Sequence, residues 1–206
     1  MFALKNDFSP ADIQNQETLR KIVLFMHTSL DGFAAGPNGE MDWIHVDDEI
    51  FDFAGNQTDD ADAALYGRVT YQMMDAYWPT AADQPGASKH DIKHSQWYNG
   101  VEKIILSRTL ETNNLKRTTV ISSNVHEQIT SIKEKPGKNI LIFGSPTAVC
   151  SLLKENLIDD FWFFINPIVL GKGISFFDGV VDRLKLKLVS NHFFSSGVVC
   201  LQYSKS

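Results

Sequence analysis

The stretch 61–77 constrains the fold most, because its hydrophobic pattern changes abruptly from one period to another. A short apolar run ends at Gly67 and indicates a buried strand. Beyond it, Tyr71, Met74 and Tyr77 recur at three-residue steps, which is the spacing of one helix face. The sequence therefore predicts a strand that passes directly into a helix at a glycine.

This junction has the chemistry of a phosphate site. The start of a helix presents unpaired backbone N–H groups and a partial positive charge, which favour anions. Gly67 permits a close approach to the backbone, Arg68 adds a planar fork of donors and Thr70 adds a hydroxyl. The junction predicts a cradle for a nucleotide phosphate, although an ordinary turn with a solvated arginine would show the same residues.

Two further predicted strands end in small or basic polar residues. These are Ser107 and Arg108 after the strand 101–106, and Gly144 and Ser145 after the strand 139–143, which leads into a helix over 147–155. In open α/β sheets, ligands bind beyond the carboxyl ends of the strands. Three such ends in one chain favour a nucleotide site over an accidental match.

The remaining elements predict one α/β domain over 21–206, preceded by an N-terminal arm over 1–20. A continuous apolar run over 21–27 indicates a strand that is buried on both faces. In the last third, strands follow strands with short turns, which indicates antiparallel pairing. We therefore expect a mainly parallel sheet flanked by helices, with an antiparallel C-terminal portion.

Two loops and one helix start are candidates for a substrate pocket. The glycine-rich segment 28–39 and the loop Gly171-Lys172-Gly173 are each typical of a loop beside a pocket, or of a plain connection. The segment 43–53 predicts a helix with acidic residues in its first turn. There, Asp48 is either a pocket acid or a residue that stabilises the helix start.

Charge and hydropathy exclude some functions. The net charge is -6 and the pI is about 5.4, which argues against nucleic acid as the main partner. No apolar run approaches the roughly 20 residues of a membrane span, and no secretory signal is visible, so we expect a cytoplasmic protein. His90 and His94 are four residues apart on a predicted helix, but no third ligand follows at a familiar spacing, so we expect no metal site.

Six short motifs occur in order over about residues 20–204. They are Ser29-Leu30-Asp31-Gly32, Gly67-Arg68-Val69-Thr70-Tyr71, Ser107-Arg108-Thr109-Leu110, Gly144-Ser145, Leu157-Ile158-Asp159-Asp160 and Pro167-Ile168-Val169-Leu170-Gly171-Lys172-Gly173. In this order they resemble the dihydrofolate-reductase-like proteins, in particular the C-terminal reductase domain of the bifunctional riboflavin-biosynthesis deaminase-reductase. Many relatives have two glycines where this chain has Gly144 and Ser145.

The resemblance implies a three-layer fold, NADPH as hydride donor and a homodimer. It places Gly67, Arg68 and Thr70 at the adenosine-side phosphates, and Ser107 and Arg108 near the adenosine 2′-phosphate. It also places Gly144 and Ser145 at the pyrophosphate or nicotinamide side, and Ala34 near the nicotinamide. In dihydrofolate reductase an acid lies a few residues past a tryptophan, and Trp43 and Asp48 have that spacing, so Asp48 is the candidate catalytic acid.

Two functions follow from this resemblance. The first is an NADPH-dependent reductase of a small pterin- or pyrimidine-like heterocycle, with the 5-amino-6-(5-phosphoribosylamino)uracil reductase of riboflavin biosynthesis as its model; Trp43, Gly171 and Gly173 would border the substrate. The second is a dimeric nucleotide-binding module without turnover. Apart from the cofactor arginines, the sequence shows no evident basic cluster for a ribose-phosphate substrate.

Overall fold

The computed structural model describes residues 19–111, 115–178, 180 and 182–206. Eight strands form one sheet in the order β5-β4-β3-β6-β1-β7-β10-β9. Their bounds are β1 Ile22–Ser29, β3 Ala61–Gly67, β4 Glu102–Leu106, β5 Thr118–Ile121, β6 Asn139–Phe143, β7 Asp160–Asn166, β9 Leu186–Phe193 and β10 Val199–Lys205. The strands from β5 to β7 pair in parallel, whereas β10 pairs antiparallel with both β7 and β9. The predicted fold class is confirmed.

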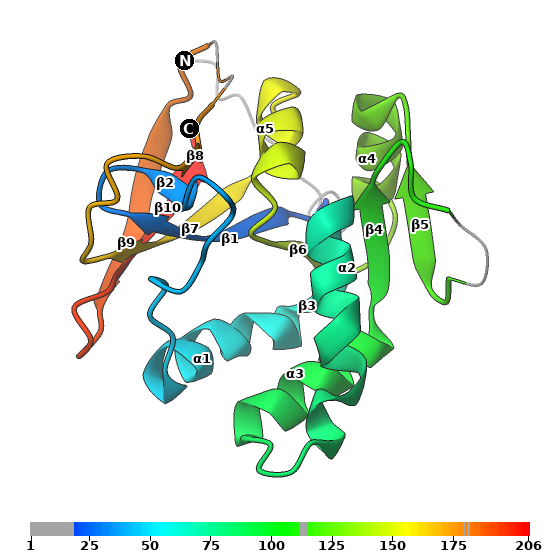
Figure 1. Cartoon of the computed structure of the whole chain (residues 1–206). Coiled ribbons are helices and arrows are strands. Elements are labelled where there is room, and N and C mark those ends of the chain that lie inside the picture. The colour runs from blue at the N-terminus through cyan, green and yellow to red at the C-terminus, as the bar shows by residue number, and fades with distance from the viewer. Residues whose placement is uncertain (1–18, 112–114, 179, 181) are drawn as a thin grey trace, which may run out of the picture.

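Helices cover both faces of this sheet (Figure 1). The helices α4 (Val125–Lys133) and α5 (Pro146–Lys154) pack on one face. On the other face lie α1 (Asp48–Gly55), α2 (Arg68–Tyr77) and α3 (Lys89–Gly100). The 3-10 helices Asn56–Asp60 and Trp78–Asp83 extend α1 and α2.

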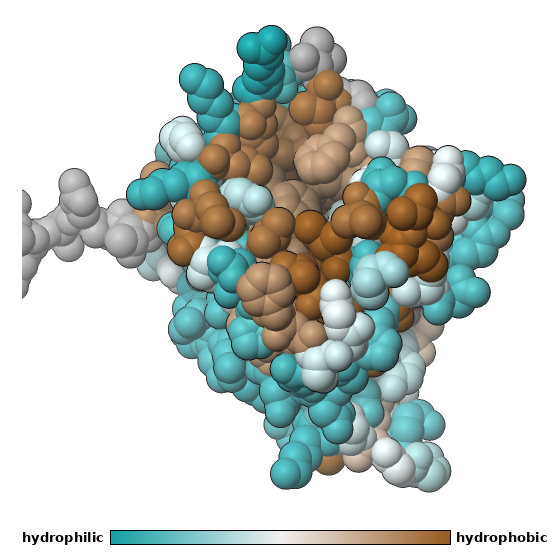
Figure 2. Space-filling view, turned by 90° about the vertical axis from the view of Figure 1, so that its left-hand side faces the viewer, coloured by the Kyte–Doolittle hydropathy of each residue, from teal (hydrophilic) through white to brown (hydrophobic). Residues whose placement is uncertain are grey.

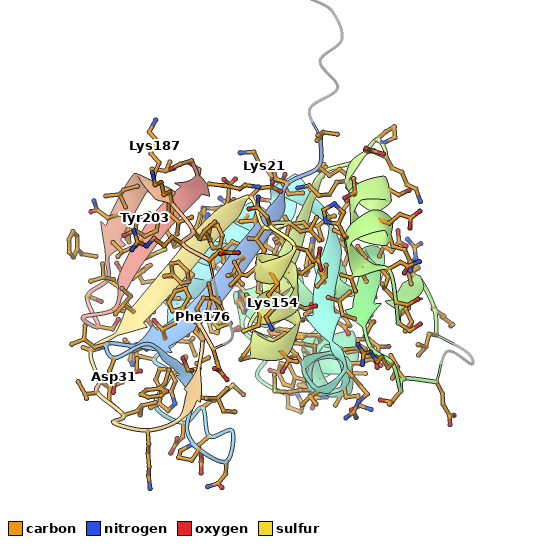
Figure 3. All side chains as sticks on the ribbon, turned by 90° about the horizontal axis from the view of Figure 1, so that it is seen from above. Lys21, Asp31, Lys154, Phe176, Lys187 and Tyr203 are labelled. Atoms are coloured by element: carbon orange, nitrogen blue, oxygen red, sulfur yellow. The ribbon has the colours of Figure 1, made fainter. Side chains whose placement is uncertain are left out.

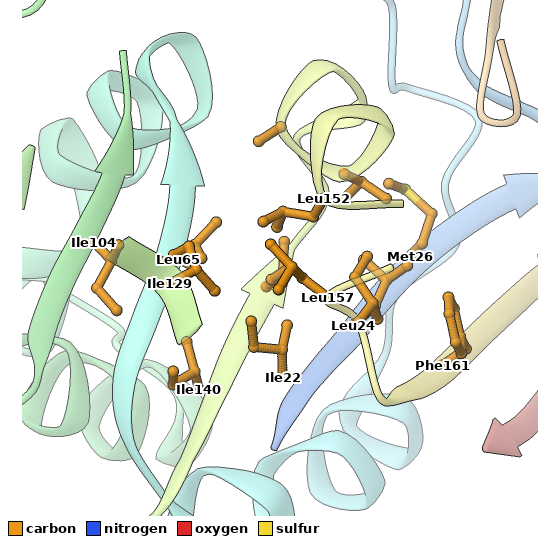
Figure 4. Close-up of a cluster of buried hydrophobic side chains, with 14 of the residues drawn as sticks. Ile22, Leu24, Met26, Leu65, Ile104, Ile129, Ile140, Leu152, Leu157 and Phe161 are labelled. Atoms are coloured by element: carbon orange, nitrogen blue, oxygen red, sulfur yellow. The ribbon is translucent and has the colours of Figure 1, made fainter. Parts of the chain in front are cut away.

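Alternation along β1 explains why its apolar run has no polar gaps. Ile22 and Leu24 join the core beneath α4 and α5 (Figure 4), whereas Val23 and Phe25 join the core beneath α1. All four side chains are buried. A strand that is covered on both faces therefore needs apolar residues at every position.

The carboxyl ends of the parallel strands meet along one edge of the sheet. Figure 3 labels Lys21, just before β1, and Asp31, just after it, at opposite ends of that strand. A second, two-stranded sheet lies beyond this edge, formed by β2 (Phe33–Ala35) and β8 (Ile174–Ser175). β2 lies within the segment 28–39 that was predicted as a loop, and β8 directly follows the predicted loop Gly171-Lys172-Gly173.

The apolar run Pro167–Leu170 is not a strand, in contrast to the neighbouring β7. Ile168 N donates within the same segment, to Asn166 O at 2.8 Å, and the end of the run is bound by a carboxylate. Asp31 Oδ1 accepts a hydrogen bond from Leu170 N at 3.1 Å, and Asp31 Oδ2 accepts one from Gly171 N at 2.8 Å. These N–H groups point to a side chain and not to a neighbouring strand, which ties two of the sequence motifs together.

The first structural contacts of the domain involve Arg20, one residue before the predicted boundary. Its side chain is buried, donates to Lys138 O at 2.8 Å and forms an ion pair with Asp62. The rest of the predicted arm, apart from Leu19, lies outside the described residues. Within those residues, no helix combines the length and apolar character that a membrane span requires.

Candidate functional site

A cavity of about 380 Å³ is lined by residues from β1, β6 and β7 and from the helices α1, α2 and α3. Helix α2 runs along it, with Thr70 in its first turn and Trp78 just past its last residue. Eight residues at 1.5 Å each separate these two side chains by roughly 12 Å along the helix axis. The cavity therefore has two ends with different linings.

We call one end the glycine end; it consists of Ala34, Ala35, Thr70, Gly144 and Ser145. Two helices begin here, because α2 starts at Arg68 and α5 starts at Pro146. Neither helix has a side-chain cap among the described residues. The N–H groups in the first turn of α2, and those of α5 after Pro146, which has none, are consequently available to a ligand.

The two helix starts are joined by a hydrogen bond. Gly67 N donates to Ser145 Oγ at 2.8 Å. A Cβ at Gly67 would lie 2.7 Å from the same oxygen, so this close approach requires glycine. Gly144 and Ser145 have φ values of 60° and 62°, so Ser145 adopts the left-handed conformation that relatives with two glycines reach without strain.

The predicted 2′-phosphate residues lie on the neighbouring strand end. In the parallel pair of β3 and β4, Gly67 lies beside Leu106. Arg68 and Ser107 are the next residues after these two neighbouring positions. Ser107 Oγ accepts hydrogen bonds from Thr109 N at 3.2 Å and Leu110 N at 3.0 Å. The serine therefore shapes the turn that carries the exposed Arg108.

We call the other end the aromatic end; it consists of Phe51, Trp78, His90, His94 and Phe143. Phe51 and His90 stack with ring centroids 3.9 Å apart, and Trp78 lies 4.0 Å from His94. Burial lowers the pKa of His94 to about 3, with a further contribution from His90, whose own pKa burial also lowers. Both rings are therefore neutral at physiological pH.

The histidine pair does not form a metal centre in the part of the chain that the structure describes. No group of three His, Cys, Asp or Glu side chains there has the proximity that a metal ion needs. The two rings instead face aromatic neighbours: Trp78 contacts both, and His94 also packs against Phe143. This pair, which the sequence suggested only as metal ligands, is part of an aromatic wall.

A third histidine, His27 on β1, also lines the cavity. Its ring stacks on Phe164 with centroids 4.8 Å apart, and burial lowers its pKa to about 4. Asn166 Nδ2 lies 3.3 Å from His27 Nδ1. Asn166 is itself 1% exposed and ends β7.

The predicted substrate-side residues lie away from this cavity. Asp48 is exposed in the first turn of α1, whose cap is Asp47, and it does not line the cavity. Trp43 Nε1 donates to Glu40 O at 3.0 Å and also lies outside the lining. The structure thus does not bring the proposed catalytic acid to the cavity.

The two loop glycines have structural roles that the structure makes plain. Gly171 has a φ of 72° and donates its N–H to Asp31. A Cβ at Gly173 would collide with the carbonyl oxygen of Ala35, so this glycine lets β8 pack against β2. Both glycines shape the edge of the site and neither lines the cavity.

Sequence reasoning did not identify His27, Asn166, Phe51, Trp78 or Phe143 as site residues. Most of them lie within apolar runs, where a buried core position is the ordinary interpretation. The available signal was a single polar residue at each strand end, His27 near the end of the run 21–27 and Asn166 after the aromatic run of β7.

Comparison with known families agrees with this geometry. The model of the RibD C-terminal domain matches residues 20–200. The chain belongs to the RibD C-terminal domain family. The chain is also similar to the uncharacterized protein YyaP of Bacillus subtilis (strain 168). The two are 35% identical over 189 residues, which cover 89% of this chain and 94% of YyaP.

Solved structures of similar fold carry reductase or riboflavin names. A putative riboflavin biosynthesis protein from Shewanella sp. PV-4 superposes with a TM-score of 0.68 at 21% identity, covering 90% of this chain and 99% of its own. The deaminase and 5-amino-6-(5-phosphoribosylamino)uracil reductase of Thermotoga maritima gives a TM-score of 0.63 at 16% identity, covering 91% of this chain and 57% of its own. These likenesses concern the fold of this RibD C-terminal domain protein.

Proposed function

We propose that this protein is an NADPH-dependent reductase of a small heterocycle. The observation that carries the proposal is the glycine end, where two helices without side-chain caps begin beside one cavity. Helix starts of this kind bind phosphate groups through their backbone N–H groups. Membership in the RibD C-terminal domain family and the reductase names of its structural neighbours support the same conclusion.

The residues at the glycine end suit a dinucleotide. Gly67 and Thr70 would border the adenosine-side phosphates, with Arg68 as the exposed cation beside them. Arg108, held out by the Ser107 turn, would face the 2′-phosphate that distinguishes NADPH from NADH. When bound, NADPH supplies a hydride, and the protein contributes binding, orientation and exclusion of water.

The cavity wall can exclude water because it is almost entirely apolar. Phe25, Ile50 and Phe164 line it from β1, α1 and β7, and all three side chains are nearly fully buried. A hydride acceptor that enters this space leaves water behind, which protects the transfer from side reactions. Asp48 takes no part in this scheme, because it is exposed outside the cavity.

We also propose that the protein forms a homodimer through the β9 edge. This edge strand exposes Leu188, Val189 and Phe193, and Val169 is exposed after β7. Figure 2 looks onto this side of the molecule, where apolar side chains gather around a hollow. An apolar edge strand left open would promote unwanted pairing, so a second copy of the chain is the occupant we propose.

Light scattering on the purified protein tests the dimer. We expect a mass twice that of the 23.2 kDa chain, and a monomer for Val189→Lys. Ile92→Lys, at an exposed apolar site on α3, is the matched control and should leave the dimer intact. A monomeric wild-type protein would contradict this part of the proposal.

Thermal unfolding with NADPH, and with NADH beside it, tests the cofactor. A ligand that binds only the native state must raise its stability. We expect NADPH to raise Tm more than NADH does, and Arg68→Ala and Arg108→Ala to reduce that rise. Arg183→Ala removes an exposed arginine that does not follow β3 or β4 and should change nothing. Absence of any NADPH effect would overturn the proposed function.

The alternative is a nucleotide-binding dimer without turnover. The observation that favours it is the lack of an acid in the cavity lining. Absorbance at the NADPH band separates the two, with 6-methylpterin, lumazine and 5-aminouracil derivatives offered as acceptors. Steady oxidation of NADPH with any of them excludes the alternative.

A further inference from the structure

The lining of the cavity has no charged side chain. Among its residues from the described part of the chain there is no Lys, Arg, Asp or Glu. Its three ionisable side chains are His27, His90 and His94, and burial lowers the pKa of each. Away from the helix starts of the glycine end, a phosphate or carboxylate would therefore be buried at the aromatic end without a counter-charge, which is costly.

The aromatic end is shaped for flat rings. Phe51 and His90 are nearly parallel, with an interplanar angle of 13°, and Trp78 and His94 lie next to them. Planar faces of this kind favour stacked or edge-on contacts with a further ring. Met73 and Met74 also line the cavity, and methionine adapts to irregular outlines.

The buried amide of Asn166 fixes which nitrogen of His27 carries the proton. His45 N donates to Asn166 Oδ1 at 2.9 Å, and Asn166 Nδ2 lies within 3.1 Å of Phe164 O and 3.3 Å of Thr28 O. These partners set the orientation of the amide, so the group that faces His27 Nδ1 is a donor. Nδ2 carries two protons for these three acceptors; with one of the protons on Nδ1, the proton of the neutral ring lies on Nε2.

Nε2–H is then the donor that His27 can offer to a ligand. Within the described residues, the His27 ring makes a single hydrogen bond, and that bond is at Nδ1. His27 lines the cavity in a wall that is otherwise mostly apolar. One oriented donor among apolar side chains fixes the position of a carbonyl or ring nitrogen.

We propose that the acceptor is an uncharged, flat ring compound without a phosphate or carboxylate, held between the aromatic side chains and hydrogen-bonded by His27 Nε2–H. This inference deepens the proposed function and rests on it for the name acceptor. Asn166 is the positioning residue of the site, because it acts through His27. The ribosyl phosphate of the riboflavin intermediate has no charged partner at the aromatic end.

Two pterins that differ by one charged group test the class of ligand. Calorimetry on the protein without cofactor compares 6-methylpterin with pterin-6-carboxylate. We expect the neutral compound to bind at least about tenfold more tightly, because the carboxylate finds no cation in the cavity. Equal affinities, preference for the carboxylate, or binding of neither compound would overturn the inference.

This titration is independent of NADPH. If the neutral preference holds and NADPH fails to bind, the proposed function is wrong and the description of the cavity stands. If NADPH binds and the carboxylate binds as well as the neutral ring, the proposed function stands and this inference is wrong.

Variants of His27 test the donor. His27→Phe keeps a ring that can stack on Phe164 but has no N–H, so the affinity for 6-methylpterin should fall about tenfold. His27→Gln keeps an N–H near the position of Nε2 and should bind more tightly than His27→Phe. His126→Gln, at an exposed position on α4, is the control for loss of a histidine and should bind like the wild type. Wild-type affinity in His27→Phe would refute the donor role.

Nuclear magnetic resonance tests the action of Asn166 separately from stability. Two-bond ¹H–¹⁵N spectra should show His27 as the Nε2–H tautomer in the wild type. In Asn166→Asp the facing oxygen can only accept, so the Nδ1 position of His27 should become protonated. An Nδ1–H tautomer in the wild type, or an unchanged His27 spectrum in a folded Asn166→Asp, would overturn the assignment.

Discussion

The two ends of the cavity recognise ligands by different parts of the protein. The glycine end uses the backbone, because the starts of α2 and α5 lie there without side-chain caps. The aromatic end uses side chains, because rings from α1, the end of α2 and α3 meet there. The first end suits a charged, common cofactor and the second suits a neutral, variable acceptor.

The two ends of the cavity also carry different energetic costs in the folded protein. At the glycine end, the cost is conformational, since Ser145 holds a positive φ. At the aromatic end, the cost is desolvation, since His90 and His94 lie in aromatic packing, and burial lowers the pKa of both. The two ends should therefore respond to different perturbations, and the predictions below separate them.

The largest expected effect is a loss of stability in mild acid. His27 and His94 have folded pKa values of about 4 and about 3, below the 6.5 of an unfolded histidine. Between pH 6.5 and 4 the unfolded chain binds more protons, so stability is full above 6.5 and falls as the pH falls. At pH 5 each histidine should remove about 2 kcal/mol of unfolding free energy. Urea unfolding at pH 7.5, 6.5 and 5 measures it.

A matched variant isolates the histidine contribution. His94→Phe keeps an aromatic ring between Trp78 and Phe143 and removes one titrating group. The fall in stability between pH 7.5 and 5 should then be about 2 kcal/mol smaller than in the wild type. An equal fall in both proteins would show that groups outside the aromatic end cause it.

The next effect concerns the side-chain amide of Asn166, which faces His27 in the cavity wall. Asn166→Ala should cost about 3 kcal/mol, because it leaves His45 N and two buried carbonyl groups without their partner. Asn56→Ala, at an exposed position in the 3-10 helix Asn56–Asp60, is the control and should cost under about 0.5 kcal/mol. Denaturant unfolding of the three proteins measures the difference, and similar costs for the two variants would contradict the role assigned to Asn166.

The glycine end of the site was predictable from the sequence, and so was the fold. The change of period at Gly67 and the apolar run of β1 depend on local rules, so the strand-to-helix starts and the mostly parallel sheet followed from them. The helix start at Arg68 was also predicted to the residue. Local pattern could not show that Asp31 takes the N–H groups of Leu170 and Gly171, because that contact joins distant segments.

The aromatic end of the site was not predictable in the same way. Phe51 and His90 are far apart in sequence, and nothing local says that their rings stack. Asp48 was chosen by its spacing from Trp43, yet both residues lie outside the cavity lining. Asp47, one residue earlier, caps the helix by accepting from Ile50 N at 2.9 Å. Spacing alone could not tell a helix start from a pocket acid.

The smallest effect lies at the glycine end and tests whether its two helix starts are coupled. Ser145→Gly should change stability little, because it loses a hydrogen bond worth about 1 kcal/mol and relieves a strained φ worth about the same. Gly67→Ala alone should cost roughly 1–2 kcal/mol, because its Cβ would lie 2.7 Å from Ser145 Oγ.

In the Ser145→Gly background, the added Cβ at Gly67 meets only Ala148 Cβ at 3.5 Å, which is ordinary contact. The cost of Gly67→Ala should then fall to nearly zero, giving a coupling of roughly 1–2 kcal/mol in a double-mutant cycle. Additive costs would mean that the two helix starts are independent, so that the glycine end is two adjacent turns. A measured coupling would show that Ser145, where many relatives have glycine, holds the two backbone sites together as one.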